Sequence, residues 1–135
     1  NENGAEFSVS PMENDLKNKI ADYSKNHDLD VVIDFVSSKS SLELGCSILG
    51  KGGRLVTLGG SGEQFLANSA DMLVKELELI GSRYCTKQEL KESLDLYARG
   101  LIKPLVSVKT DFDGAEGLHD KIEKGEITGR AGILI

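Results

Sequence analysis

Apolar stretches of strand length alternate with amphipathic stretches along the whole chain. The expected strands are Glu6–Ser10, Asp30–Val36, Gly53–Leu58, Leu77–Ser82, Val106–Val108 and Ala131–Ile135. Within them, Val31–Val36 is almost wholly apolar and rich in β-branched residues. Such a run is typical of a strand that is buried on both faces, as in a parallel sheet covered by helices.

The amphipathic stretches begin with helix start signals, and most of them end at a glycine. Capping boxes stand at Ser10–Glu13, Ser40–Glu43 and Thr86–Glu89, a fourth start stands at Asp113–Glu116, and the stops are Gly50, Gly100 and Gly125. Helices interleaved with strands in this way predict an α/β fold rather than a helical bundle. The segment 59–75 breaks the alternation, and we expect a loop with a short helix or an extended piece there. No linker interrupts the pattern, so residues 1–135 are predicted to form one domain.

Composition and charge narrow the classes of partner. The formal net charge is −6 and the chain has no basic stripe, which argues against a nucleic-acid partner. No apolar run approaches the ~18 residues of a membrane span and no signal peptide is visible, so we expect a cytoplasmic protein without a membrane partner. Cys46 and Cys85 lie far apart without a neighbouring histidine, which favours reduced thiols over a metal site.

Small residues follow three of the expected strands, in Phe35–Ser38, Leu58–Gly62 and Gly81–Tyr84. In open parallel sheets, ligands bind outside the carboxyl ends of the strands, where small residues let a flat ligand approach the backbone. The same residues also serve as ordinary turn residues, so both interpretations stand. The chain carries no G-x-G-x-x-G fingerprint, no cluster of zinc ligands and no nucleophile elbow. We therefore assign no catalytic and no metal-binding residue, and we expect the isolated chain to be inactive.

A set of collinear runs resembles the medium-chain dehydrogenase/reductase family, in particular its zinc-type alcohol dehydrogenases. The runs are Asp30–Val36, Leu42–Leu44, Lys51–Val56, Lys75–Ser82, Asp95–Gly100, Ile102–Val106 and Lys124–Ala131. The resemblance implies a Rossmann-like parallel sheet flanked by helices. It also implies that this sheet is incomplete, because the first strand–helix–strand unit and the catalytic domain are missing. The chain would be the C-terminal half of the dinucleotide-binding domain together with the family's C-terminal segment.

The same resemblance implies that this chain contacts NAD or NADP. Phe35 and Val36 would line the adenine-ribose side of the cofactor. Leu58 and Gly59 would approach the nicotinamide, and the Leu58 carbonyl would accept a hydrogen bond from its carboxamide. The backbone N–H of Ile80 would bind the same amide group.

Arg130 would lie near the pyrophosphate, where a guanidinium can bridge phosphate oxygens; the alternative is a surface ion pair. The chain departs from the family pattern at Ser37, where a glycine often follows the valine. It departs again at Arg83–Cys85, where Tyr-Val-Gly is more common. The cofactor contacts at these two places are therefore less firmly implied.

The implied reaction of the parent protein is hydride transfer between an alcohol and NAD(P), with zinc held by the missing catalytic domain. Two alternatives stay open: a zinc-free quinone or enoyl reductase of the same superfamily, and a non-catalytic structural or binding fragment. The apolar segment Met72–Ile80 predicts a subunit contact, because the corresponding segment often extends the sheet across a two-fold axis in the family. A homo-oligomer is therefore expected.

The missing strands would leave one edge of Asp30–Val36 unpaired, and an exposed apolar edge invites pairing with another strand. We expect one of three outcomes. The segment Glu6–Ser10 moves beside this strand through a right-handed crossover, which we favour. Otherwise a second copy of the chain pairs there, or residues of the parent protein outside this chain complete the edge.

Overall fold

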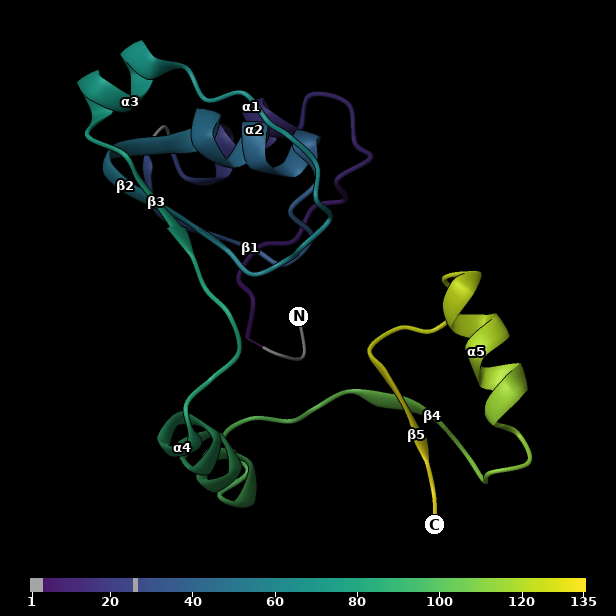
Figure 1. The fold of residues 1–135 in the computed structure, drawn as a ribbon. Helices are drawn as coiled ribbons and strands as arrows, with labels where there is room; N and C mark the ends of the chain where they lie inside the picture. The colour runs from purple at the N-terminus through teal and green to yellow at the C-terminus, as the bar shows by residue number, and fades with distance from the viewer. Residues whose placement is uncertain (1–3, 26) are drawn as a thin grey trace. The chain divides into compact units, whose positions relative to one another are not determined.

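The computed structural model describes residues 4–25 and 27–135. The chain divides into two compact units, Asn1–Tyr84 and Cys85–Ile135, and each contains a small parallel sheet with helices (Figure 1). The expected strand and helix segments beyond residue 28 each correspond to an observed element, apart from shifts at their ends. The α/β architecture with parallel sheets is thereby confirmed, whereas the assignment of residues 1–135 to one domain stays a prediction.

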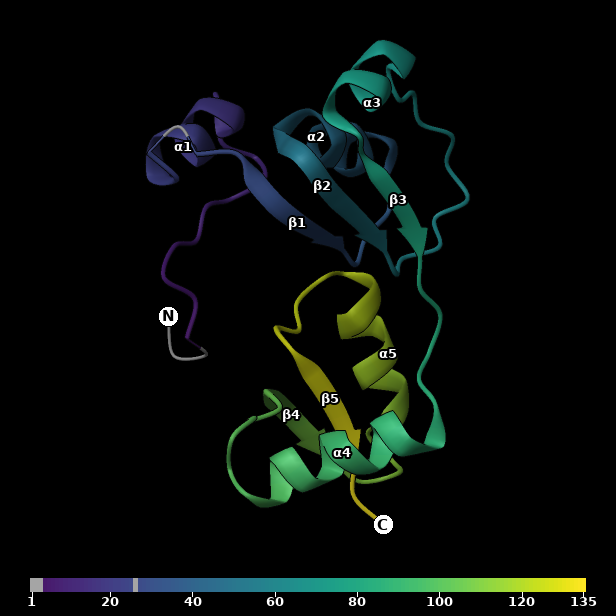
Figure 2. The same ribbon diagram turned by 90° about the vertical axis from the view of Figure 1, so that its left-hand side faces the viewer.

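The sheet of the first unit consists of β1 (Leu29–Asp34), β2 (Leu49–Thr57) and β3 (Glu78–Gly81), in the order β1-β2-β3. Both pairings are parallel, and all three strands run with their carboxyl ends toward the same edge (Figure 2). Strand β2 begins four residues earlier than the sequence predicts. Its pairing with β1 jumps from Leu49 to Arg54, so the intervening residues Gly50–Gly53 form an irregularity within the strand.

The core of this unit lies between the sheet and the helices α1 (Leu16–Tyr23), α2 (Lys39–Ile48) and α3 (Ser69–Lys75) (Figures 1 and 2). Its buried centre is formed by Leu42, Leu49 and Leu55. Gly45 lets α2 approach the sheet closely, because a Cβ atom at this position would lie 2.9 Å from Leu55 Cδ1. Leu42 belongs to α2, whereas Leu49 is the first residue of β2, and both side chains are buried.

The prediction that β1 is buried on both faces is wrong, because the face of the sheet away from the helices is exposed. Val31 is 49% exposed and Ile33 is 56% exposed, although both are apolar strand residues. The reason is that α2 and α3 pack on the other face, through Val32 and its neighbours. On the exposed face, Arg54 of β2 instead forms a cross-strand ion pair with Glu78 of β3.

The start of α2 also differs from the sequence prediction. Its N-cap is Ser38 rather than Ser40, and Ser38 and Ser41 form the capping box, with Ser41 Oγ accepting from Ser38 N at 3.0 Å. Several serines in succession can each serve as a cap, and propensity alone does not distinguish them. The contact that selects Ser41 comes from the end of β1 and is part of the candidate site.

The N-terminal segment contradicts two expectations. Glu6–Ser10 forms no strand; the Phe7 ring stacks on Tyr23 at 4.3 Å, and the Tyr23 hydroxyl donates to the Glu6 carboxylate at 3.0 Å. Packing on α1 therefore takes the place of strand pairing. The capping box at Ser10 is also wrong, because Ser10 accepts a hydrogen bond from Met12 N within a turn and α1 begins only at Leu16.

Within the described residues, β1 pairs with β2 and with no other strand. The favoured expectation that Glu6–Ser10 completes the free edge of β1 is therefore wrong. Pairing with a second copy, or with residues of the parent protein outside this chain, stays a prediction.

The second unit contains α4 (Lys87–Ala98), β4 (Val106–Thr110), α5 (Ala115–Glu123) and β5 (Arg130–Ile133). Strands β4 and β5 pair in parallel, with α5 as the connection between them. The predicted capping box of α4 is confirmed, since Thr86 Oγ1 accepts from Glu89 N at 3.2 Å. Among residues 4–25 and 27–135, no helix combines the length and the apolar composition that a membrane span requires.

Replacing Leu55 by alanine tests the position of the core. Leu55 is 1% exposed, so its truncation should lower the free energy of unfolding by about 2–5 kcal/mol. Leu66→Ala is the matched control, because Leu66 is 80% exposed. Chemical denaturation of both variants measures the difference, and equal effects at the two positions would contradict the described core.

Candidate functional site

The segments that follow β1 and β2 are joined at the carboxyl edge of the three-stranded sheet. The backbone carbonyl of Asp34 accepts hydrogen bonds from Leu58 N at 2.8 Å and from Gly59 N at 3.4 Å. On the other side of β2, the carbonyl of Thr57 accepts from Ser82 N at 2.9 Å. The three segments that the sequence analysis marks as ligand-binding candidates therefore lie side by side.

Asp34 holds the first of these segments through its side chain. Its Oδ1 atom accepts from the backbone N–H groups of Val36 at 2.8 Å and Ser37 at 2.9 Å. Its Oδ2 atom accepts from the Ser41 hydroxyl at 2.7 Å. Asp34 is only 6% exposed, and three hydrogen-bond donors take the place of water around its carboxylate. The carboxylate thus ties the turn after β1 to the first turn of α2.

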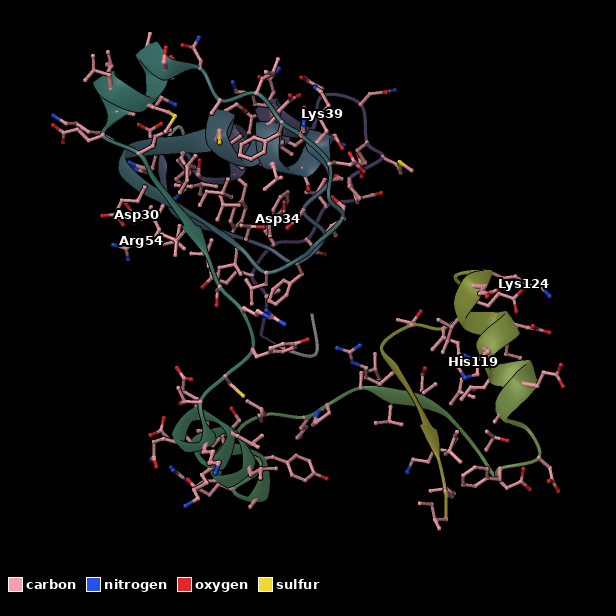
Figure 3. All side chains as sticks on the ribbon, viewed as in Figure 1. Asp30, Asp34, Lys39, Arg54, His119 and Lys124 are labelled. Atoms are coloured by element: carbon pink, nitrogen blue, oxygen red, sulfur yellow. The ribbon has the colours of Figure 1, made fainter. Side chains whose placement is uncertain are left out.

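Figure 3 shows this arrangement relative to the rest of the sheet. Asp34 lies toward the end of the sheet where Lys39 begins α2, whereas Asp30 and Arg54 lie toward the other end. Asp30 and Asp34 belong to the same strand, but Asp30 is exposed. Two aspartates of one strand thus have different environments.

Ser37 adopts a backbone conformation that favours glycine, the residue that the family pattern often has at this position. Its φ angle is +57°, in the left-handed region where glycine is favoured. Three contacts hold it there: its amide bonds Asp34, its hydroxyl bonds that of Thr57, and its carbonyl accepts from the Ser61 hydroxyl. A glycine would adopt this conformation without such support, so the serine relies on its neighbours.

Gly59 makes the closest approach between the two segments. A Cβ atom placed on Gly59 would lie 2.5 Å from both the carbonyl carbon and the oxygen of Val36, and 2.8 Å from the Phe35 oxygen. Only a glycine therefore fits against this backbone without displacing it. The absence of a side chain here lets the two backbone segments lie in direct contact at this edge of the sheet.

The structure brings together five of the residues that the resemblance implies in cofactor binding. Phe35, Val36, Leu58 and Ile80 expose apolar side chains at or near the carboxyl edge, and Gly59 lies half-buried among them. Their role in binding NAD or NADP stays a prediction.

Arg130, the remaining implied residue, belongs to the second unit. It begins β5, its backbone N–H donates to the Leu105 carbonyl at 2.8 Å, and its exposed side chain lines a hollow with Ile122 and Ile127.

The sequence analysis missed the polar residues that support this edge. Asp34, Ser41 and Thr57 each lie within or next to runs that we interpreted through their apolar neighbours. One signal was available: an aspartate inside an otherwise apolar run, such as Asp34 within Val31–Val36, predicts a buried charge, and buried charges are paired or hydrogen-bonded. The serines after it supply those donors.

Zinc, which the resemblance implies for the parent protein, has no ligand set in the described part of this chain. Among residues 4–25 and 27–135, no group of three or more His, Cys, Asp and Glu side chains is placed to hold a metal ion. The cofactor fits better, because Phe35, Val36 and Leu58 expose apolar side chains at the carboxyl edge, where ligands of open parallel sheets bind.

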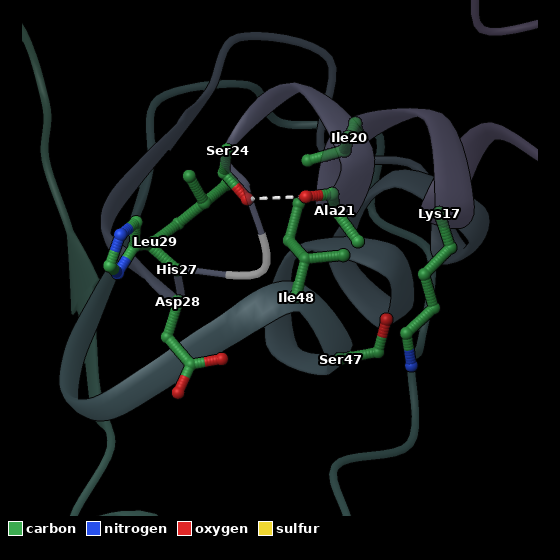
Figure 4. A pocket seen from close by; sticks show the side chains of 9 residues that line it. All are labelled: Lys17, Ile20, Ala21, Ser24, His27, Asp28, Leu29, Ser47 and Ile48. Atoms are coloured by element: carbon green, nitrogen blue, oxygen red, sulfur yellow. Dashed lines mark hydrogen bonds between the residues drawn. The ribbon is translucent and has the colours of Figure 1, made fainter.

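A cavity elsewhere in the first unit does not belong to this edge. It measures about 210 Å³ and lies where α1 and the end of α2 meet the amino end of β1 (Figure 4). Its lining includes Lys17, His27 and Asp28, and the Ser24 hydroxyl beside it donates to the Ala21 carbonyl at 3.0 Å. The cavity is at the wrong end of a parallel sheet for a ligand of this fold.

Replacing Gly59 by alanine should force Phe35–Val36 and Leu58–Gly59 apart. Overpacking of this kind typically costs about 1–3 kcal/mol, so the free energy of unfolding should fall by that amount. Gly60→Ala is a matched control, because a Cβ atom there meets nothing within 4 Å. Chemical denaturation of both variants checks the prediction, which fails if Gly59→Ala is as stable as the control.

The Asp34 carboxylate should make stability depend on pH. Burial, the largest influence, raises the pKa of Asp34, but hydrogen bonds from the Ser37 amide, the Ser41 hydroxyl and the Val36 amide outweigh it and bring the pKa below its ordinary 3.8. A carboxyl group with a lowered folded pKa stabilises the fold above its unfolded pKa, and this contribution disappears as the pH falls through the folded pKa.

The difference in unfolding free energy between wild type and Asp34→Asn should therefore be constant near neutral pH and shrink below about pH 3.8. Denaturation curves recorded over this range measure it. Asp30→Asn, on the same strand, controls for the loss of one negative charge. A wild-type advantage over Asp34→Asn that grows in acid would contradict the assigned hydrogen bonds.

Comparison with known proteins supports the resemblance. The family model described as zinc-binding dehydrogenase matches residues 1–99. An NAD-dependent alcohol dehydrogenase of Sulfolobus acidocaldarius is 28% identical over 129 residues, covering 94% of this chain and 36% of that protein. An alcohol dehydrogenase of Geobacillus stearothermophilus is 27% identical over 132 residues, covering 98% of this chain and 38% of that protein. The chain thus spans somewhat over a third of these relatives.

Solved structures show the same fold. The alcohol dehydrogenase of Aeropyrum pernix superposes with a TM-score of 0.84 at 26% identity, covering 95% of this chain and 36% of that one. The structure of AibC superposes with a TM-score of 0.86 at 24% identity, covering 97% of this chain and 39% of that one. The Rossmann-like fold is therefore confirmed. Because the family model extends over 99 of the 135 residues, we conclude that the chain belongs to the zinc-binding dehydrogenase family.

Proposed function

We propose that the protein containing this chain is an NAD(P)-dependent oxidoreductase that transfers hydride between an alcohol and the cofactor. In this proposal the chain supplies part of the cofactor-binding domain. The observation that carries it is the joined carboxyl edge, where Gly59 packs on the Phe35–Val36 backbone and Phe35, Val36 and Leu58 expose apolar side chains. Family membership and the relatives that are named alcohol dehydrogenases support the class of reaction.

The chemistry of hydride transfer belongs to the cofactor, whose nicotinamide ring accepts or releases the hydride when bound. The residues of this chain bind and orient. Phe35 and Val36 offer apolar contact for the adenine-ribose side, and Leu58 and Gly59 for the nicotinamide side. Both pairs follow paired strands and are joined by hydrogen bonds to the Asp34 carbonyl, which favours precise placement of a planar ring.

Two further features belong to the proposal. The exposed apolar residues Leu73, Val74, Leu79 and Ile80 support a homo-oligomer that forms through Met72–Ile80. Cys46 and Cys85 are both free thiols, which supports a location in the cytoplasm.

The function is tested by titrating the full-length protein with NADH and with NADPH while nicotinamide fluorescence is recorded. We expect saturable binding of at least one of them, and cofactor-dependent oxidation of simple alcohols. The 135-residue chain alone should show no turnover, since no catalytic group is assigned to it. Full-length protein that binds neither cofactor would overturn the proposal. Turnover of quinones or enoyl substrates by a zinc-free protein would replace the alcohol with the alternative substrate class.

Arg130→Ala in the full-length protein should weaken cofactor binding by about 1–3 kcal/mol, the scale of a lost charge-assisted hydrogen bond to a phosphate. Lys124→Ala is a suitable control, because it removes one exposed positive charge from the end of α5 in the same unit. The dissociation constant of NADH measures both effects. An unchanged constant in Arg130→Ala would make this residue an ordinary surface cation.

A further inference from the structure

We infer that Asp34 is a positioning residue for the cofactor: through hydrogen bonds it holds both backbone segments that would face the ligand. This inference rests on the proposed function. Asp34 itself would touch neither the cofactor nor the reacting atoms. It would act on Phe35, Val36, Leu58 and Gly59 by setting the backbone on which they stand.

The contacts of Asp34 reach both segments at once. Its carboxylate accepts from the amides of Val36 and Ser37 at 2.8 and 2.9 Å. Its backbone carbonyl accepts from Leu58 N at 2.8 Å, and Gly59 N lies 3.4 Å from the same oxygen. One buried residue therefore couples the end of β1 to the end of β2.

The turn needs this support because Ser37 has a left-handed backbone. A non-glycine residue in that region is disfavoured, and it persists only where the surroundings hold it. The Asp34 carboxylate bonds the Ser37 amide directly, and the Ser41 hydroxyl, at 2.7 Å, holds the carboxylate in turn. If the carboxylate is lost, the turn should sample other conformations, in which Val36 no longer packs on Gly59.

If the binding surface is correctly formed in only a fraction of the molecules, the apparent affinity for the ligand is reduced by that fraction. The apparent dissociation constant equals the intrinsic constant divided by the fraction of molecules in the competent conformation. A turn that is correctly formed in a tenth of the molecules would therefore weaken NADH binding about tenfold. The chain would remain folded, because the leucine core of this unit is separate from the turn.

The test uses variants at position 34 whose side chains differ in their ability to accept hydrogen bonds from the backbone amides of Val36 and Ser37. Asn keeps an oxygen for Val36 and Ser37, and its amide group can donate to Ser41, whose hydroxyl already lies 3.1 Å from the Ser38 carbonyl. Ser forms such turns more weakly, and Ala cannot form them. In the full-length protein we expect NADH affinity to fall in the order Asp34, Asp34→Asn, Asp34→Ser, Asp34→Ala, with the alanine variant about tenfold weaker than wild type.

A second set of variants tests whether Asp34 affects cofactor binding through the conformation of the turn. In a Ser37→Gly background the left-handed conformation needs less support, so Asp34→Ala should weaken binding less there than in wild type. Asp30→Ala, on the exposed part of the same strand, is the control and should leave NADH affinity unchanged. Thermal unfolding of every variant separates loss of affinity from loss of fold. If Asp34→Ala does not fold, the difference between the asparagine and serine variants carries the comparison.

The outcomes distinguish this inference from the proposed function. Wild-type protein that binds neither NADH nor NADPH overturns the proposed function and the inference with it. Wild-type binding, together with equal NADH affinities for all folded Asp34 variants, overturns the inference alone and leaves the function standing. A graded loss that Ser37→Gly does not lessen shows that Asp34 does not act through the turn, and it overturns the inference as well.

Discussion

The buried carboxylate of Asp34 is the interaction on which the functional edge depends. A charge with this little exposure is tolerated only when hydrogen bonds replace water, and here two backbone amides and one hydroxyl do so. The donors Val36, Ser37 and Ser41 all follow the strand closely in the sequence, the last of them in the first turn of α2. The same residue contributes its backbone carbonyl to the neighbouring segment. The buried Asp34 carboxylate needs these hydrogen-bond donors. The backbone that would face a ligand is therefore held in one conformation.

Glycine has a separate role at the same edge. Gly59 is needed because it has no side chain: a Cβ atom there would collide with the Phe35–Val36 backbone. Ser37 is the converse case, because it occupies a glycine-like conformation and relies on neighbouring polar groups. The edge therefore combines a glycine that allows close packing with a serine that is held in place.

The two faces of the first sheet differ in a way that affects stability. One face is covered by helices and contains the leucine core, whereas Val31 and Ile33 remain exposed on the other. An apolar face together with an open strand edge is a surface that other polypeptide tends to cover. This chain spans somewhat over a third of the length of these relatives.

Local sequence determined the element types, because hydrophobic period and capping chemistry are properties of short segments. The pattern located the strands from Asp30 onward, and it correctly identified the start of α4 from Thr86–Glu89. It placed Phe35, Val36, Leu58 and Gly59 at strand ends, and the structure brings them to one edge.

Tertiary contacts decided what local patterns could not. Glu6–Ser10 has the composition of a strand, yet a strand requires a partner, and Phe7 packs on Tyr23 instead. The choice of Ser38 over Ser40 as the cap of α2 depends on Ser41, whose hydroxyl bonds Asp34 from another element. Whether a face is buried depends on where the helices pack, which the period of β1 does not encode. The sequence by itself thus determined the elements and the order of the candidate residues. The tertiary structure decided how the segments after β1 and β2 meet, because the hydrogen bonds from Leu58 to Asp34 and from Ser61 to Ser37 join parts distant in the chain.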